Sequence, residues 1–278
     1  MDDQIEPSFA SARTSGGIRL VTLAELARAG SWQLNLVHDR RETLLIWITR
    51  GQGLALLDGA RRGFGTHNAL LIPAQTLFSL DAGRQVFGQA LVIPPGAAVH
   101  LPETVQHLRI RDVASQTELT MLLEALGREQ TARRDFAQEA MAAYAALAAI
   151  WLRRHPAPET ERPDASRRLS GAYCARLVGH FASGASMAEH AAALGVTPTH
   201  LTRVCRAETG RTAAALLTER LLHAARSRLI GSQTPVQEIA RDLGFGSAAY
   251  FTRFVQQHTG QSPTALRRAA LPHPPQVA

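Results

Sequence analysis

Lysine is absent from this 278-residue chain, and all thirty basic residues are arginine. The charge is distributed unevenly. Residues 1–166 contain 17 Arg against 18 Asp and Glu, whereas residues 167–278 contain 13 Arg against 5 Asp and Glu. The basic C-terminal part indicates a polyanionic partner such as nucleic acid, although a solvated charged surface would give the same imbalance.

Cysteine is scarce, and long apolar runs are missing. The two cysteines, Cys174 and Cys205, lack the spacing of metal ligands, so we expect reduced, structural thiols. No run of eighteen apolar residues occurs, and the acidic N-terminus lacks the apolar core of a signal peptide. These absences predict a cytoplasmic protein with no membrane partner.

Motifs for catalysis and for cofactors are also absent. The chain has no phosphate-binding loop, no dinucleotide fingerprint and no recognisable Ser-His-Asp set. His38, His67, His100 and His107 are isolated, whereas a metal site in a small barrel needs histidines and a carboxylate close together. We therefore expect no cofactor, no bound metal and no enzymatic activity.

Short apolar runs separated by Gly-containing turns occupy the region from Trp32 to Pro95. Runs of four to eight residues, several of them alternating, predict a small antiparallel barrel or sandwich. A hairpin is expected around Arg50–Gly53. The runs are WQLNLVH, TLLIWIT, GLALLDG, NALLIPA, LFSLDA and QVFGQALVIPP.

The apolar period becomes helical after Ser115. Ser115 and Glu118 have the spacing of a capping box, and a second, Ala-rich helix is expected over Asp135–Arg154. A leucine stripe on the first helix can pack on its own domain or on a partner subunit, and a dimer contact is the favoured interpretation. The stripe is Leu119, Leu122, Leu123 and Leu126.

The remaining segments complete the predicted domain organisation. Residues 155–166 are rich in proline and charge, which is typical of a linker, and the Pro-rich residues 271–278 are expected to be a disordered tail. Residues 1–154 would form one domain, and residues 167–270, which have helical patterns throughout, would form a second.

Two segments of the C-terminal part have the layout of a helix-turn-helix. The first helix-turn-helix motif is Ser186–Thr212, and the second is Pro235–Pro263. In the first, Ser186 and Thr197 are expected to cap the two helices, and Pro198 suits a first turn. In the second, the expected caps are Thr234 and Ser247. The second helix of such a motif enters the DNA major groove.

The residues available to DNA follow from the expected faces of these helices. Arginine can form a bidentate bond to guanine, and threonine can contact thymine methyls, bases or phosphates. Arg203 and Arg253 could instead be surface ion-pair residues. The predicted DNA-binding residues are Thr199, His200, Thr202, Arg203 and Arg206, then Ser247, Ala248, Ala249, Tyr250 and Arg253.

The stretch from about His180 to Arg268 resembles the DNA-binding domain of the AraC/XylS family of bacterial transcription regulators. The resemblance rests on LTRVCRAETG, RLLHAARSRLI, IARDLGFGSAAYFTRFV and HTGQSPTALRR. By position, it places base-reading roles on Thr199, Thr202 and Arg203, and on Ala248, Ala249, Tyr250 and Arg253. Val255-Gln256-Gln257 departs from the family pattern, in which a basic residue is usual, and the two alanines cannot bond base edges through their side chains.

The same resemblance implies a cupin-like β-barrel before the DNA-binding domain, able to bind a small organic effector. Large side chains could line such a pocket, although a core role is the favoured interpretation for each: Trp32, His38, Trp47, Phe64, Phe78 and Phe87. The resemblance further implies RNA polymerase as a partner, a homodimer, and activation more often than repression.

The sequence as a whole predicts an α+β protein of two domains. The N-terminal domain would be a cupin-like β-barrel with two helices, and the C-terminal domain all-α, with two helix-turn-helix motifs joined by a long helix. The predicted function is sequence-specific binding of double-stranded DNA in transcriptional regulation, responsive to a small effector. The alternative is a cupin-type enzyme whose helical tail serves only for dimerisation.

Overall fold

The computed structural model describes residues 16–132, 134–156 and 164–270. The chain divides into two compact units, of which one is Gly17–His223. The described residues of the other are Gly16 and 224–270. Most of the predicted linker and the whole predicted tail lie outside the described residues, so the domain boundaries drawn from the sequence stay a prediction.

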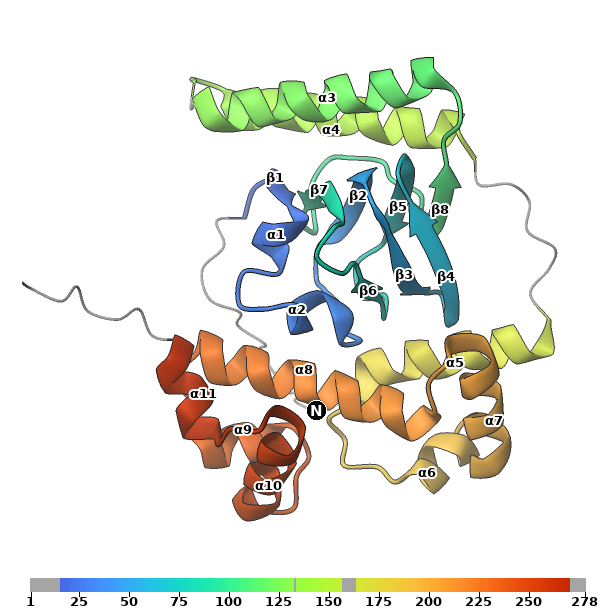
Figure 1. The fold of residues 1–278 in the computed structure, drawn as a ribbon, viewed down its shortest axis with the longest axis vertical. Helices are drawn as coiled ribbons and strands as arrows, with labels where there is room; N and C mark the ends of the chain where they lie inside the picture. Colours follow the sequence, from blue (N-terminus) through green and yellow to red (C-terminus); the bar gives the residue numbers. More distant parts are fainter. Residues whose placement is uncertain (1–15, 133, 157–163, 271–278) are drawn as a thin grey trace, which may run out of the picture. The chain divides into compact units, whose positions relative to one another are not determined.

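Eight strands in the larger unit form two antiparallel sheets (Figure 1). The five-stranded sheet has the order β1-β7-β2-β5-β8, and the three-stranded sheet has the order β4-β3-β6. The sheets remain open, so the described strands do not close into a single hydrogen-bonded barrel. The strands are β1 (Arg19–Thr22), β2 (Thr43–Arg50), β3 (Gln52–Leu57), β4 (Ala60–Gly65), β5 (Asn68–Ile72), β6 (Ser79–Asp81), β7 (Phe87–Ile93) and β8 (Gln106–Arg109).

Three apolar clusters arise from the two-residue period of these strands. In β2, Leu44 and Ile46 face the cluster between the two sheets, which we call the inter-sheet core. Leu45 and Trp47 face the opposite side, where they pack under two long helices. The third cluster joins Val37, Leu56 and Leu77 of the sheet domain to helices that follow in the chain. We call it the shared core.

The strand pairing corrects two sequence predictions. The run from Trp32 forms a short helix, α2 (Trp32–Asn35), followed by one bridge between His38 and Phe78, rather than a strand. The expected hairpin of β2 with β3 does not form, because β2 pairs with β5 and β7 while β3 pairs with β4 and β6. The actual hairpin joins β3 to β4 through Asp58 and Gly59, both at positive φ, as a two-residue turn requires.

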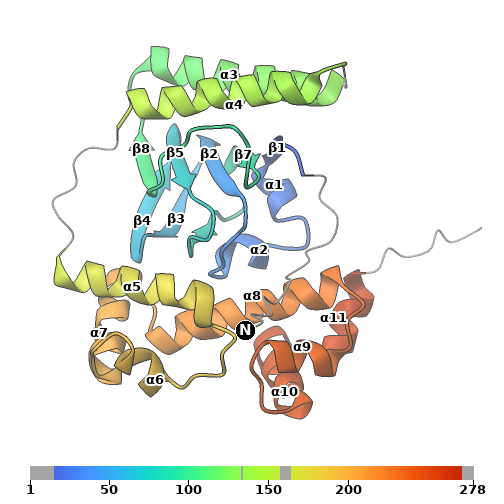
Figure 2. The same ribbon diagram turned by 180° about the vertical axis from the view of Figure 1, so that it is seen from behind.

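Two long helices, α3 (Val113–Ala132) and α4 (Ala137–Arg154), cover the five-stranded sheet (Figure 2). The predicted capping box at Ser115 is wrong: the helix begins two residues earlier, and the Asp112 carboxylate accepts the Ser115 N–H at 2.8 Å. Burial accounts for the leucine stripe without a second subunit. Leu119, Leu123 and Leu126 are buried in the cluster beneath α3, and Leu122 is partly buried against it.

The remaining helices range from 4 residues in α1 to 19 residues in α8. They are α1 (Leu23–Leu26), α5 (Ala165–His180), α6 (Met187–Ala192), α7 (Pro198–Thr209), α8 (Ala213–Gly231), α9 (Val236–Asp242), α10 (Ala248–Thr259) and α11 (Pro263–Ala270). The long helix predicted between the two motifs is therefore confirmed as α8. Among the described residues, none of the helices has both the length and the apolar composition needed to cross a bilayer.

The hairpin turn at Gly59 yields a stability prediction. A Cβ on Gly59, whose φ is +65°, would meet the Gly171 amide nitrogen of α5 at 2.4 Å. A Cβ on Gly83, at φ +58°, would have nothing within 4 Å of it. We expect Gly83→Ala to cost roughly 1 kcal/mol of backbone strain, and Gly59→Ala to cost at least about 1–2 kcal/mol more. Denaturant unfolding measures both, and equal losses would contradict this close approach of the turn to α5.

Candidate nucleic-acid interface

The first helix-turn-helix motif is built from local capping interactions. Ser186 and Glu189 form a reciprocal capping box at the start of α6. The Thr197 hydroxyl accepts the His200 N–H at 3.2 Å, and Pro198 occupies the first turn of α7. Both predicted caps are confirmed. Between the helices, Gly195 at φ +69° reverses the chain.

The second motif repeats this design. Ser247 caps α10 by accepting the Tyr250 N–H at 3.1 Å, as the sequence predicts. The predicted Thr234 cap of α9 is wrong, because the N-cap residue is Pro235, which has no side-chain cap bond. The Thr234 carbonyl instead accepts a bond from Arg267 of α11.

An offset of fifty residues superimposes the recognition-helix sequences of the two motifs. The Thr209 and Thr259 hydroxyls both donate to the carbonyl four residues earlier, at 2.7 Å, and each helix ends at a left-handed glycine. Buried Cys205 corresponds to Val255. Arg203 and Arg253 therefore occupy equivalent positions on equivalent helices, and their side chains are both exposed.

The exposed face of α7 carries the predicted reading residues. Thr199, Arg203 and Arg206 are exposed, while His200 and Thr202 are partly exposed. The Arg203 Nη2 atom lies 3.1 Å from His200 Nδ1, a contact that presents the guanidinium beside the imidazole. The opposite face, with Leu201, Val204 and Cys205, is buried. The helix is thus supported on one side and open on the other.

The exposed face of α10 is less polar. Ser247, Ala249, Tyr250 and Arg253 are exposed, and Ala248 is partly exposed. Phe251 is buried behind them. Because the alanines offer methyl groups only, hydrogen bonding to base edges from this face falls to Tyr250 and Arg253.

The arginines of both faces keep their charge available. Among the described residues, Arg203, Arg206 and Arg253 form no ion pair with a carboxylate. The surface ion-pair interpretation of Arg203 and Arg253 therefore has no support in this part of the chain. Such side chains can pair with phosphate or with guanine.

The side chains expected to line an effector pocket are not gathered in one place, although the His38 and Phe78 rings are in contact at 4.3 Å. Trp47 lies under α3 and donates to the Thr120 hydroxyl at 3.2 Å. Phe64 and Phe78 pack in the inter-sheet core. Trp32 and His38 lie against His223 of α8, at ring distances of 5.4 and 4.2 Å. Phe87 is exposed. The structure does not bring these residues together around one cavity.

By residue type, the histidines and cysteines are also possible metal ligands. In the part of the chain that the structure describes, no group of three or more His, Cys, Asp or Glu side chains is placed to hold a metal ion. Cys174 and Cys205 are free thiols buried in the shared core. Burial raises the pKa of each to about 12, which keeps them protonated.

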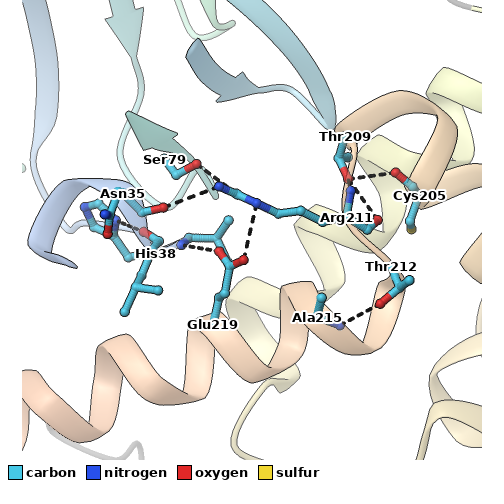
Figure 3. A network of polar contacts seen from close by, with 11 residues as sticks. Asn35, His38, Ser79, Cys205, Thr209, Arg211, Thr212, Ala215 and Glu219 are labelled. Atoms are coloured by element: carbon cyan, nitrogen blue, oxygen red, sulfur yellow. Dashed lines mark hydrogen bonds and ion pairs between the residues drawn. The ribbon is translucent and has the colours of Figure 1, made fainter. Parts of the chain in front are cut away.

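Arg211, directly after α7, ties the first motif to the sheet domain (Figure 3). Its guanidinium donates to the Ser79 hydroxyl at 3.0 Å and to the Asn35 carbonyl at 3.4 Å, and it pairs with Glu219 of α8 at 3.3 Å. At the equivalent position the second motif has Gln261, which is exposed. The arginine is therefore specific to the motif that contacts the sheets.

The segment from Asn35 to Asp39 contacts α8 at three positions. The Val37 amide donates to Glu219 at 3.4 Å, and Asp39 pairs with Arg220 at 2.7 Å. The Arg220 guanidinium also stacks on Phe181 at 3.7 Å. His38 stacks on His223, and its backbone exchanges two hydrogen bonds with Phe78.

The sequence did not predict these partners of α8. Glu219, Arg220 and His223 do fall within one helical turn, which is a signal for a shared face. Their partners lie about 180 residues earlier, however, and no local pattern predicts a contact over that separation.

Comparison with known proteins identifies the segment that carries both motifs. Residues 190–269 match the model of a family described as "Helix-turn-helix domain". No curated protein matches the chain by sequence.

Several solved structures are similar to the chain. Apo ToxT from Vibrio cholerae strain SCE256, in a single-residue variant, is 11% identical with a TM-score of 0.43, covering 93% of this chain and 99% of that one. The C-terminal domain of AraT, a response regulator from Geobacillus stearothermophilus, is 25% identical with a TM-score of 0.34. The match covers 40% of this chain and 88% of that one. A DNA-binding transcriptional dual regulator from Escherichia coli K-12 is 21% identical with a TM-score of 0.33, over 41% and 97%.

Replacing Arg211 tests the tie between the first motif and the sheet domain. Arg211→Gln installs the residue of the equivalent second-motif position and leaves Glu219 without its cation. We expect a loss of about 1–3 kcal/mol in unfolding free energy, because bonds to a charged group at a partly buried site are removed. Arg154→Gln, which removes the exposed 3.8 Å pair with Glu118, is the control and should cost less than about 0.5 kcal/mol. Similar losses in both variants would show that Arg211 is an ordinary surface residue.

The free energy of unfolding should depend on pH through His38. Burial, followed by the charges of His223 and Arg40, holds the pKa of His38 well below its usual 6.5. The unfolded chain therefore binds the extra proton first, and stability present above pH 6.5 is lost as the pH falls below that value. The slope is up to about 1.4 kcal/mol per pH unit for one such histidine.

Unfolding by denaturant at a series of pH values between 7.5 and 5 measures that slope. His38→Gln should reduce the slope, whereas His100→Gln, at an exposed loop position, should leave it unchanged. An identical slope in the wild type and in His38→Gln would show that His38 is not buried as a neutral ring.

Proposed function

We propose that the protein is a sequence-specific DNA-binding regulator of transcription that responds to a small-molecule effector. Residues 190–269 match a helix-turn-helix family model, and their motifs resemble those of the AraC/XylS family. One observation supports this above the others. The two motifs present arginines at equivalent, exposed helix positions, Arg203 and Arg253, with no carboxylate partner among the described residues.

The two recognition helices have different tasks in this proposal. The α7 face, with Thr199, Thr202 and Arg203, supplies hydrogen-bonding readout of base edges, and His200 and Arg206 contact phosphates. The α10 face reads thymine methyls through Ala248 and Ala249. Tyr250 and Arg253 add polar contacts there, and Ser247 orients the helix start. The arginines also supply a salt-dependent backbone term.

The effector response is proposed to pass through the shared core. The sheet domain and the first motif lie in the same compact unit, joined by Val37, Leu56 and Leu77 and by the Arg211 contacts. An effector that favours one arrangement of the sheet domain would then favour one arrangement of α7 and α8. Activation is the proposed direction, with RNA polymerase as partner.

Other parts of the proposal concern assembly and class. We infer a homodimer in the cytoplasm and a cupin-like class for the two-sheet domain, over residues 1–154. The predicted stripe is buried, so a partner subunit would contact the outer faces of α3 and α4, where Met121 and Leu147 are exposed. Catalysis forms no part of the proposed function.

Selection of DNA by the full-length protein tests the function. The protein would be incubated with a library of genomic fragments, and the bound fragments would be sequenced. A recurring site made of two short elements about one helical turn apart, near 10 base pairs, is expected for two reading helices. Retention that is only non-specific and salt-sensitive would contradict sequence-specific recognition.

Arg203 should dominate the readout. Arg203→Ala is expected to weaken binding to a selected site by about 1–3 kcal/mol and to relax preference at one base pair. Arg128→Ala, at an exposed position on α3, removes the same charge outside both motifs and is the matched control. Gel-shift titrations at fixed salt measure both variants, and an unchanged affinity and footprint in Arg203→Ala would remove Arg203 from the reading set.

A further inference from the structure

The two sheets leave an open seam between their edge strands, β8 of the five-stranded sheet and β4 of the three-stranded sheet. Arg109 of β8 reaches β4, where its guanidinium donates to the Gly63 carbonyl. A hollow of about 630 Å³ lies in the seam and opens to solvent. We call it the seam hollow. Its principal lining residues are Leu54, Gly63, Phe64, Gly65, Asn68 and Arg109.

The walls of the seam hollow are largely apolar, and they leave open space for a ligand. Phe64 belongs to the inter-sheet core and closes the inner side, whereas Leu54 is 40% exposed on the outer side. Gly63 and Gly65 contribute bare backbone, and a Cβ added at Gly63 would meet nothing within 4 Å. The volume is that of pockets that hold small organic ligands, about 300–1,000 Å³.

The mouth of the seam hollow is cationic. Arg109 is exposed, and within the described ranges its guanidinium has one protein partner, the Gly63 carbonyl, at a long 3.4 Å. A guanidinium has five N–H donors in a fork that fits a carboxylate. Arg109 therefore has donors to offer a ligand at the rim of an apolar space.

Asn68, one of the lining residues, forms a neutral polar pair with His107. His107 Nε2 lies 2.7 Å from Asn68 Oδ1, so each satisfies the other. Burial, followed by the charges of Arg109 and Arg62, lowers the pKa of His107 to about 4. Among the lining residues, the positive charge at neutral pH is therefore carried by Arg109.

We propose that the seam hollow binds a small hydrophobic carboxylic acid, with its carboxylate on Arg109 and its apolar body against Leu54 and Phe64. This names the effector site and ligand class of the proposed function, and rests on it. One exposed guanidinium can form two parallel N–H···O bonds to one carboxylate, and the apolar walls suit a ligand with an apolar body.

The position of β4 connects this site to the first motif. Its Gly63–Gly65 end lines the seam hollow, and its other end contacts α5 and α7. There the Arg61 guanidinium lies close to Gly210, at the end of α7. A Cβ added to this glycine would be 3.2 Å from Arg61 Nη1. A ligand that moves β4 therefore acts on the helix with the Arg203 reading face.

Thermal-shift and calorimetric titrations of the full-length protein test the site. The probes are benzoate, 4-phenylbutyrate, hexanoate and octanoate, each compared with its neutral amide and with phenyl phosphate. We expect at least one carboxylate to raise the melting temperature and its amide to have no effect. In NMR titrations the same carboxylate should raise the pKa of His107, because a negative charge then lies beside it.

Three variants and a control locate the binding. Arg109→Gln should weaken binding about tenfold to a hundredfold, and Arg109→Lys should restore part of it. Gly63→Val fills the seam hollow with a residue that strands favour and should abolish binding. Arg84→Gln removes an exposed arginine elsewhere in the domain and should bind as the wild type does.

Several results would overturn the proposal: no binding of any carboxylate probe, equal binding of the amides, tighter binding of phenyl phosphate, or unchanged binding in both Arg109→Gln and Gly63→Val. DNA selection separates this failure from that of the proposed function. A protein that selects a DNA site but binds no carboxylate leaves the regulator standing and removes only the seam site.

Discussion

The shared core is the constraint on which the arrangement of the larger unit depends. Val37, Leu56 and Leu77 bring sheet-domain side chains into the same apolar cluster as Tyr173, Leu201 and Leu216 of the helices. Separating the two would expose this apolar surface to water, at about 25 cal/mol for each Å². The buried face of α7 is therefore held by the sheet domain as well as by its own motif, and the opposite face is exposed.

Polar contacts around this core give it a defined register. Arg211, Glu219 and Arg220 place charged groups where each has a partner from the Asn35–Asp39 segment or beside it. Burial raises the pKa of Glu219, and the Arg211 guanidinium and the Val37 amide oppose that shift. Partly buried charges tolerate few alternative pairings, since an unpaired one is costly. The sheet domain is thereby joined to α8 by paired charges as well as by apolar contacts.

Local chemistry made the two motifs predictable, and distant pairing made the rest difficult. Ser186, Thr197 and Ser247 cap helices through bonds to residues three positions away, so the sequence contains the whole signal. The partners of β2 and β3 depend on strands further along the chain, and the expected hairpin at Arg50–Gly53 was wrong for that reason. The sequence did not predict strand β4, because ARRGFG has little apolar alternation, although this strand lines the seam hollow.

Hydrogen exchange of the full-length protein tests most directly the claim that the first motif and the sheet domain are one folded unit. We expect the amides of Leu201–Cys205 in α7 and of Ala55–Leu57 in β3 to exchange through openings whose free energies are equal within about 1 kcal/mol. Both openings require the shared core to be disrupted. Exchange at Leu201–Cys205 that is several kcal/mol easier, with Ala55–Leu57 still protected, would contradict it. The motif would then be an independent domain, and the sheet domain could not act on it through the shared core.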